Sequence, residues 1–594
     1  MKLTTIGKIA IALFLAGVLY GLYYFFGPKI KVLESKAVST IEVQNDNVNT
    51  ATTSAKLQLP STAPTGSGKP RINVSGYAWN AQSAIIAANG GPQTTEGSLM
   101  EKYGVNLSIT RQDWLTELRN NQLKFIEKFD NGQAMPTEGS AGIMIMGDGA
   151  PFYISSTQQA LDEKYGKGKY NLKVVGSIGK SYGEDKLIGP VAWKLNPQAA
   201  KGAYISTVIG DGDWVVVVNW AALNGLKVNP DPNTYDPDAI NFKSAKNDDF
   251  IESAKEFITS QKQGLEYELK VVKDGKPTGE TIKKKIDGCA TWSPADKTIF
   301  DELTGVTDIV STKEFNNQMP CVLIVADEWA KKNPETIAGI LKATLEAGGQ
   351  IKQYDEWMKF ASGAVSRTFD SETPDFWYKL FKGYAGEKGG LPYNVGGSQV
   401  MNLADNKIYF GLKPGENSRY EKVYNQVSKY LKDLNPGGFN DNVKNMVSYA
   451  DAVNLSYVSQ ISGIDEGTAT QANYDRTASA LVGKGQWQIN FATGKDNILA
   501  SSTSTLQSLL NLLSQAEEGK IEILGHTDNT GNAEANEALS KARAESVKRW
   551  LKDRGIAEGR FQLVEGRGSR NALETNDSPE GRAKNRRVEV LVKN

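Results

Sequence analysis

The chain of 594 residues is poor in the residue types on which metal sites and much catalysis depend. It has one histidine and two cysteines, and its 68 basic residues equal its 68 acidic residues. A histidine-rich metal site is therefore excluded, and His526 is the one histidine that could serve a nucleophile. A net charge of zero argues against a nucleic-acid protein, which would carry a basic excess. The sequence predicts no metal, no cofactor and no nucleic-acid partner.

The two cysteines do not form a CxxC motif, because Cys289 and Cys321 lie far apart in the chain. Two interpretations stay open at this point. The pair could form a single disulfide in an exported domain, or both could be buried free thiols.

Residues 6–26 are almost continuously apolar apart from Lys8. A run of about 20 such residues is long enough to cross a bilayer as a helix. A cleaved signal peptide is the alternative, but bulky aromatics rather than a small-residue cleavage site end the run. We expect residues 1–27 to be an uncleaved transmembrane anchor, and residues 28–69, rich in Ser, Thr, Pro and Gly, to be a flexible linker.

Short apolar runs alternate with helical patterns over residues 70–445, which is typical of an α/β domain. Polar and aromatic side chains follow several of the predicted strands. Because open α/β sheets bind ligands beyond the carboxyl ends of their strands, these residues are candidates for a solute cleft. For each, the alternative is a loop or lobe-packing role. The candidates are Trp79, Asp148, Asp211, Asp213, Thr291 and Trp292.

The order of segments in this region, including GDGDW at 210–214 and MPCVLIVADEWAKKNPE at 319–335, resembles periplasmic solute-binding proteins of the phosphate, nitrate and sulfonate type. The resemblance implies two α/β lobes joined by two crossings, with a ligand cleft between them. Lobe 1 would comprise about 70–190 and 315–445, and lobe 2 about 191–314. The implied ligand is a small anionic or polar solute.

A partly helical connector is expected at 446–484, followed by a compact domain at 485–594. Its predicted order is β-α-β-α-β, a loop and a last strand, with strands at 486–491, 521–524, 561–565 and 587–592. Asp528 lies just past the second strand, and Arg543 follows fifteen residues later on a helix. Opposite charges in one place suit a zwitterionic ligand, although Asp528 could be a turn residue and Arg543 a solvated charge.

The motifs GHTDNTG at 525–531 and SPEGRAKNRRVEV at 578–590 resemble the OmpA-like peptidoglycan-binding domain, also found in Pal-type lipoproteins and flagellar stator subunits. The resemblance implies that Asp528 and Arg543 grip the diaminopimelate of the stem peptide. Asp528 would accept from its ammonium, and Arg543 would take its carboxylate with two donors. Thr527 and Asn536 would flank the groove, and His526 would be a hydrogen-bonding structural residue.

The predicted fold class is therefore α/β: an N-terminal transmembrane helix, a two-lobed solute-binding-like domain and a C-terminal α+β OmpA-like domain. The predicted protein is a single-pass bacterial inner-membrane protein with its bulk in the periplasm. It would hold peptidoglycan non-covalently and carry a domain for solute capture or sensing. The alternative is a scaffold of an envelope complex, with the solute-binding-like domain as a platform for a protein partner. Nothing in the sequence indicates an enzyme.

Overall fold

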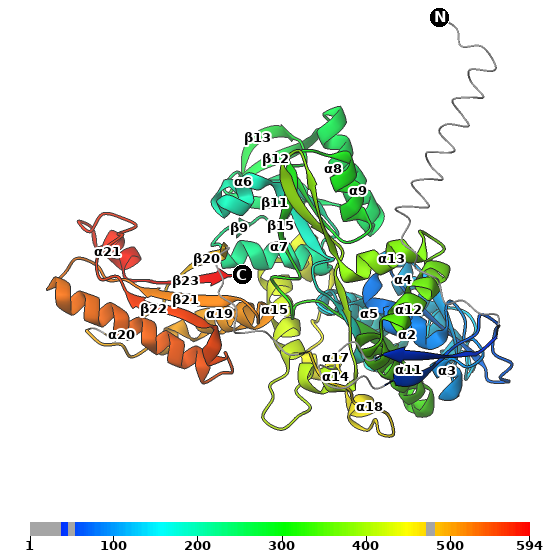
Figure 1. Ribbon diagram of the computed structural model, residues 1–594. Helices are drawn as coiled ribbons and strands as arrows, with labels where there is room; N and C mark the ends of the chain where they lie inside the picture. The colour runs from blue at the N-terminus through cyan, green and yellow to red at the C-terminus, as the bar shows by residue number, and fades with distance from the viewer. Residues whose placement is uncertain (1–36, 45–53, 471–480, 493) are drawn as a thin grey trace, which may run out of the picture.

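The computed structural model describes residues 37–44, 54–470, 481–492 and 494–594 (Figure 1). The predicted anchor at 1–27 lies outside these residues. Within the described ranges, no helix is both long and apolar enough to cross a membrane. The anchor therefore stays a prediction.

Lobe 1 is built on a six-stranded sheet in the order β19-β6-β16-β5-β3-β4. Its strands are β3 (Arg71–Gly76), β4 (Asn106–Arg111), β5 (Gly142–Met146), β6 (Leu172–Ser181), β16 (Pro320–Ala326) and β19 (Ser398–Val400). The apolar runs at 105–110, 141–146 and 173–178 lie largely within β4, β5 and β6. Helices α2 (Ser83–Asn89) and α11 (Pro334–Gln353) pack on β6, while α4 (Leu115–Asp130) packs on β3 and β5.

Lobe 2 has its own six-stranded sheet in the order β15-β7-β14-β8-β11-β9. Its strands are β7 (Lys186–Pro190), β8 (Tyr204–Thr207), β9 (Lys227–Val228), β11 (Ala239–Ser244), β14 (Gly288–Thr291) and β15 (Val306–Ser311). Helix α7 (Gly212–Leu223) contacts β7 and β14 and is buried almost all round, which explains its VVVV run. Helix α8 (Phe250–Gln263) covers β8 and β14.

The chain crosses between the lobes at 182–185 and at 312–319, between β6 and β7 and between β15 and β16. The predicted lobe boundary at 190 is corrected, because β7 already pairs with β14 and β15 of lobe 2. A hairpin formed by β17 (Tyr384–Lys388) and β18 (Leu391–Val395) is a second excursion of the chain onto lobe 2. There the Thr307 hydroxyl donates to the Pro392 carbonyl at 2.6 Å.

The predicted flexible linker at 28–69 is also corrected over its described part. Strands β1 (Ser39–Gln44) and β2 (Ser54–Leu59) pair antiparallel. Leu57 and Leu59 are buried in the core of lobe 1, and the Ser61 and Thr65 amides bond to backbone carbonyls of lobe 1. The alternation of SAKLQL at 54–59 gives an apolar face, so burial outweighs the polar composition of the segment.

The C-terminal domain contains a four-stranded sheet in the order β20-β23-β21-β22. The strands are β20 (Leu481–Trp487), β21 (Lys520–Gly525), β22 (Phe561–Gly566) and β23 (Val588–Lys593), and the helices are α19 (Thr503–Gln515), α20 (Ala533–Lys552) and α21 (Pro579–Asn585). The predicted element order is confirmed. The first strand lies earlier than the predicted 486–491, because it pairs along β23 from Leu481 onward.

The connector at 446–484 is partly helical in its described part, with α17 (Tyr449–Ala452) and α18 (Ser456–Ser459). It packs on lobe 1, where the Asn454 amide donates to the Val174 carbonyl. The C-terminal domain in turn packs on lobe 2 and on α15 (Arg419–Leu434), as the orange and yellow elements of Figure 1 show. Asn219 of α7 donates to Gln515 at 2.8 Å, and Arg419 pairs with Glu517 at 2.8 Å.

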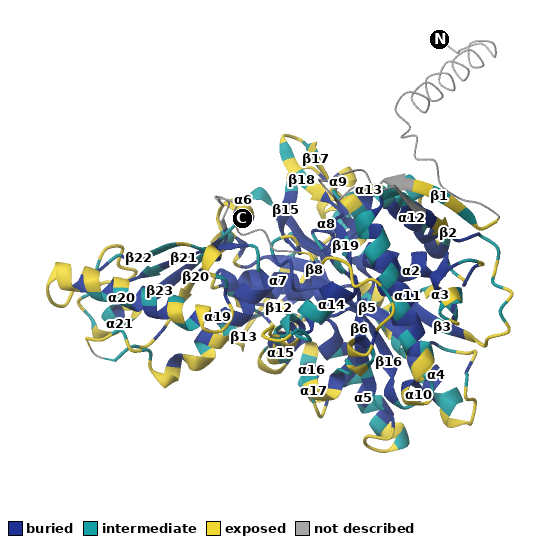
Figure 2. Ribbon diagram, turned by 60° about the horizontal axis from the view of Figure 1, so that its bottom comes forward, coloured by how far each residue is buried: buried dark blue, intermediate teal, exposed yellow. Residues whose placement is uncertain are grey.

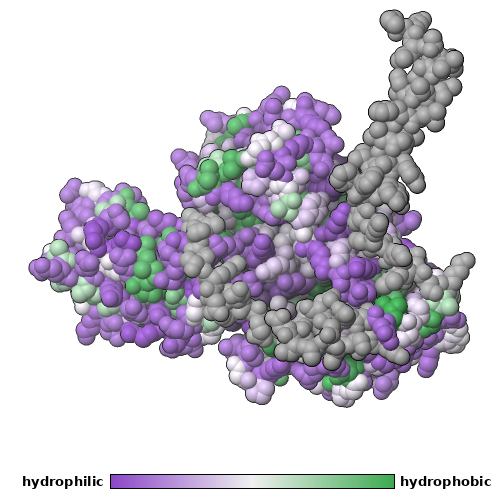
Figure 3. All heavy atoms as spheres, viewed as in Figure 1, coloured by the Kyte–Doolittle hydropathy of each residue, from purple (hydrophilic) through white to green (hydrophobic). Residues whose placement is uncertain are grey.

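The sheets form the buried interior, and exposed residues gather on outer helix faces and loops (Figure 2). The face shown in Figure 3 is mostly hydrophilic, with small hydrophobic patches. Cys289 on β14 and Cys321 on β16 are both buried and free. They belong to different lobes, so the structure favours the free-thiol interpretation.

Candidate functional site

The turn that follows β21 lies against helix α20 in the C-terminal domain. Gly525 ends the strand so close to the helix that a Cβ there would lie 2.0 Å from the Ser540 carbonyl oxygen. Asn532 caps α20 by accepting from the Glu534 and Ala535 amides. Because strand, turn and helix are contiguous, the turn at 526–531 and the first turns of α20 share one corner of the domain.

Asp528 lies in this turn with both carboxylate oxygens bonded. One oxygen accepts from the Thr530 amide at 2.9 Å, and the other accepts from Arg586 at 2.6 Å. Burial alone would raise the pKa of Asp528, but the Arg586 and Thr530 donors outweigh it and lower the pKa. Asp528 is therefore a stable carboxylate anion at neutral pH.

Arg543 reaches the same corner from α20. Its Nε donates to the Lys495 carbonyl at 3.2 Å, and its guanidinium lies 5.0 Å from the ring centroid of Phe491. Burial, followed by the nearby charge of Arg586, lowers its pKa from the usual value of arginine, while Asp528 opposes this shift. Arg543 stays charged at neutral pH. Its two terminal nitrogens, Nη1 and Nη2, suit a carboxylate.

Thr527 and Asn536, which were predicted to flank the groove, also lie in this corner. Asn536 donates to the Thr530 carbonyl at 3.0 Å and so fixes the turn to α20. The Thr527 amide bonds to the Gly568 carbonyl, whereas its buried hydroxyl has no protein partner. Nδ1 of His526 contacts the Arg570 carbonyl at 3.3 Å, and its Nε2 lies 3.7 Å from Glu589. Burial lowers the pKa of His526, which fits a neutral structural ring.

Arg586 completes the corner from the loop before β23. The sequence NRRV at 585–588 contains this arginine. Its ion pair with Asp528 joins residues 58 positions apart and depends on the pairing of β23 with β21. The sequence alone does not tell whether this arginine lines the groove or pairs with a nearby glutamate. Its side chain is about half exposed, so a ligand could reach it.

Four of the predicted cleft residues meet where the two lobes face each other. The Tyr77 hydroxyl of lobe 1 donates to Asp211 of lobe 2 at 3.1 Å. Gln318, on the second crossing, donates to Asp148 at 2.7 Å and to the Gly212 carbonyl at 3.3 Å. Burial raises the pKa of Asp213, and the charges of Asp148 and Asp211 raise it further. Burial also raises the pKa of Asp185, while the nearby Trp79 indole lowers it. All these carboxyl groups are fully buried.

The remaining two candidates have packing contacts. The Thr291 hydroxyl donates to the Phe250 carbonyl, and the Trp292 ring stacks on Phe250 with centroids 3.7 Å apart. Trp292 also lies 5.3 Å from Tyr77, so its ring borders the interlobe region from the lobe 2 side.

Comparison with known proteins gives different relatives for the C-terminal domain and for the rest of the chain. Residues 490–586 match the model of the OmpA family, so the C-terminal domain is an OmpA-like domain. The peptidoglycan-binding protein ArfA of Mycobacterium tuberculosis is 38% identical over 104 residues, which are 18% of this chain and 32% of ArfA. The chain thus spans about a third of the length of that relative.

Solved structures also resemble parts of the chain. The cell wall anchor of the T6SS from Pseudomonas aeruginosa is 30% identical, covers 20% of this chain and 86% of its own, and has a TM-score of 0.17. Over the N-terminal part, the neighbours are periplasmic solute-binding proteins. The nitrate-binding protein NrtA from Synechocystis PCC 6803 is 12% identical, covers 65% of this chain and 94% of its own, and has a TM-score of 0.40.

Proposed function

We propose that this chain is a cell-envelope binding protein that holds peptidoglycan through Asp528 and Arg543 and presents a solute-binding domain at the wall. The observation that carries the proposal is that the carboxylate of Asp528 and the guanidinium of Arg543 lie at the same corner of an OmpA-like domain. The diaminopimelate side chain ends in an ammonium and a carboxylate. Asp528 would receive the first and Arg543 the second.

The anchor at 1–27 would place the chain in the inner membrane with its bulk in the periplasm. The chain would then link membrane and wall, and it would act by binding rather than by catalysis. The described contacts between the C-terminal domain and lobe 2 support a fixed placement of the solute-binding domain relative to the wall.

A peptidoglycan pull-down with purified sacculi tests the grip. Asp528→Ala and Arg543→Ala are each expected to weaken binding about tenfold or more, because each leaves one ligand charge poorly compensated. Asp553→Ala and Arg554→Ala are matched controls, since both residues are exposed near the far end of α20. Binding by Asp528→Ala equal to that of the controls would show that the site is elsewhere.

A second candidate function is a scaffold in an envelope complex. It is favoured by one observation: Trp79 and Trp292 are completely buried, so the chain's own side chains fill much of the interlobe region. A protein partner would then bind the outside of the lobes, and no small solute would raise the melting temperature.

A further inference from the structure

The interlobe region gathers four aspartates from three parts of the fold. Asp148 comes from lobe 1 after β5, Asp211 and Asp213 come from lobe 2 at the start of α7, and Asp185 comes from the first crossing. All four are at most 2% exposed. Burial is the main reason why the pKa of each is raised, to about 6 for Asp211 and about 7 for Asp185. The other aspartates then raise the pKa of Asp213 further.

Two helices begin at this cluster, and both starts carry carboxylates. Asp211 caps α7 by accepting from the Gly212 amide at 2.9 Å, and Asp213 lies in the first turn. Helix α5 (Ala150–Tyr165) begins just after Asp148, and a Cβ at Gly212 would lie 2.7 Å from an Asp148 oxygen. Helix N-termini ordinarily attract anions. Here the chain's own carboxylates occupy both, so an anionic solute would be repelled.

Several fully buried polar atoms at this place have no hydrogen-bond partner in the protein. Both carboxylate oxygens of Asp213 are among them, while the oxygens of Asp185 and the indole Nε1 of Trp79 approach each other only outside good hydrogen-bond geometry. Trp79 is 0% exposed, and its indole lies near enough to Asp185 to lower the pKa of that carboxyl. Unpaired buried polar groups cost free energy and are rare in folded proteins. This set points to a bound molecule that offers several donors and one acceptor.

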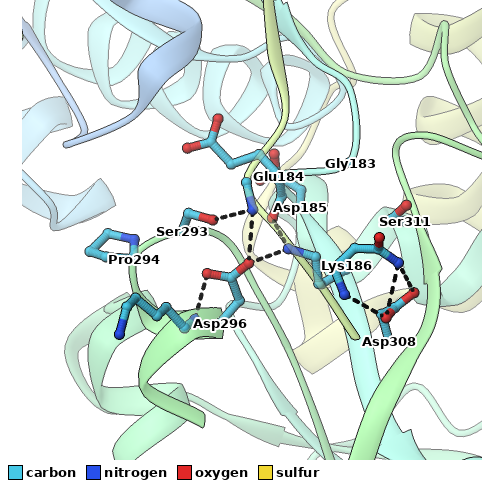
Figure 4. A network of polar contacts seen from close by, with 12 residues as sticks. Gly183, Glu184, Asp185, Lys186, Ser293, Pro294, Asp296, Asp308 and Ser311 are labelled. Carbon is cyan, nitrogen blue, oxygen red and sulfur yellow. Dashed lines mark hydrogen bonds and ion pairs between the residues drawn. The ribbon is translucent and has the colours of Figure 1, made fainter. Parts of the chain in front are cut away.

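The polar contacts at the neighbouring first crossing do not supply hydrogen-bond partners for these atoms. Lys186 is fully buried, pairs with Asp296 and donates to the Glu184 carbonyl at 2.9 Å (Figure 4). The Ser398 hydroxyl, at the start of β19 in lobe 1, donates to the Glu184 carboxylate. Lys186 thus already has partners, and the oxygens of Asp213 still lack a donor.

We propose that the interlobe region binds a small solute carrying a protonated amine, with the ammonium held between Asp213 and Asp185. The ammonium supplies three donors for these carboxylates, and the Trp79 Nε1 donates to an oxygen of the same solute. Tyr77 and Trp292 add aromatic faces, which attract cations. The solute enters when the lobes separate about their crossings. The inference rests on the proposed solute-binding role of this domain.

Thermal melting of the full chain with small probes tests the ligand class. Ethanolamine and putrescine at millimolar concentration are expected to raise the melting temperature of the lobes by several degrees, because a ligand of the native state stabilises it. Nitrate, phosphate and methanesulfonate should leave it unchanged, as should calcium chloride. Asp213→Asn removes the charge while keeping the shape, so the amine-induced shift should disappear. Asp238→Asn, at an exposed site of lobe 2, is the matched control and should keep the shift.

The melting temperature of Asp213→Asn without any probe shows whether the variant folds. Asp148→Asn is a second variant for the same test. A shift caused by the anions but not by the amines would overturn the amine assignment while leaving solute binding intact. A shift with calcium alone would overturn it in favour of a metal ion, and no shift with any probe would also overturn it. The sacculus pull-down on the same preparation tests wall binding separately, so failure of the two proposals is distinguishable.

Discussion

The OmpA-like domain and the interlobe region both contain several buried charged residues, but only the OmpA-like domain pairs most of them with other protein groups. In the OmpA-like domain Asp528 pairs with Arg586, Arg587 pairs with Glu589 at 2.6 Å, and Arg560 donates to three backbone carbonyls. In the interlobe region Asp213 has no donor on either carboxylate oxygen, and Asp185 has none in good hydrogen-bond geometry. One region compensates its charges internally, and the other does not.

The difference separates two kinds of binding. At the proposed wall site, a ligand ammonium would have to share or replace the Arg586 partner of Asp528, so binding would be an exchange of ion pairs. Between the lobes, a ligand amine would meet carboxylates without a competing partner. Removing a compensated charge should therefore destabilise the protein, whereas removing an uncompensated one should stabilise it.

The largest expected effect concerns Arg560, which is 1% exposed. Arg560→Met should destabilise the OmpA-like domain by about 3 kcal/mol or more, because the carbonyls of Gly519, Leu513 and Ala516 lose charged donors. Urea denaturation measures the effect. Lys541→Met, at an exposed position of α20, is the control and should change stability by less than about 0.5 kcal/mol. Equal stability of the two variants would contradict the idea that compensation holds this domain together.

The next effect is a dependence of lobe stability on pH. The pKa of Asp211 is raised to about 6 and that of Asp185 to about 7 in the folded chain, mainly by burial. Unfolded aspartates lose their protons near pH 4, so between about pH 4 and 7 the folded state holds more protons. Stability should therefore fall as pH rises, by up to about 1.4 kcal/mol per pH unit for each proton, and be greatest at acidic pH.

Thermal melting followed by tryptophan fluorescence between pH 5 and pH 8 measures this dependence, with the pH values chosen around the raised pKa values. Asp185→Asn should flatten the profile. Asp148, Asp211 and Asp213 titrate in the same region, with Lys186 beside them, so part of the slope should persist. A profile that rises toward pH 8 would show that these carboxyl groups are paired in solution.

The smallest expected effect concerns the competing arginine at the wall site. Arg586→Ala should raise the pKa of Asp528 and strengthen peptidoglycan binding a few-fold, because Arg586 competes with the ligand ammonium and repels Arg543. Binding to sacculi at several salt concentrations measures it, with Arg582→Ala as the control on α21. Weaker binding would show that Arg586 contacts the ligand directly and belongs to the grip.

The sequence by itself determined most of the OmpA-like domain. Asp528, Asn536 and Arg543 lie on one strand–turn–helix segment, so short-range geometry brings them together. It also indicated alternating strands and helices over the lobes, because apolar runs such as those of β5 and β16 are nearly uninterrupted. It misplaced the segment at 54–69, where two buried leucines outweigh a polar composition.

Only the tertiary structure decided which charges are compensated. Arg586 meets Asp528 across 58 residues, and the interlobe aspartates come from a lobe 1 loop, a crossing and the start of α7. Whether a carboxylate has a donor depends on which distant elements pack beside it, and no local pattern encodes that. The sequence therefore supplied the charged residues, while packing set their partners and burial, and with them the two expected modes of binding.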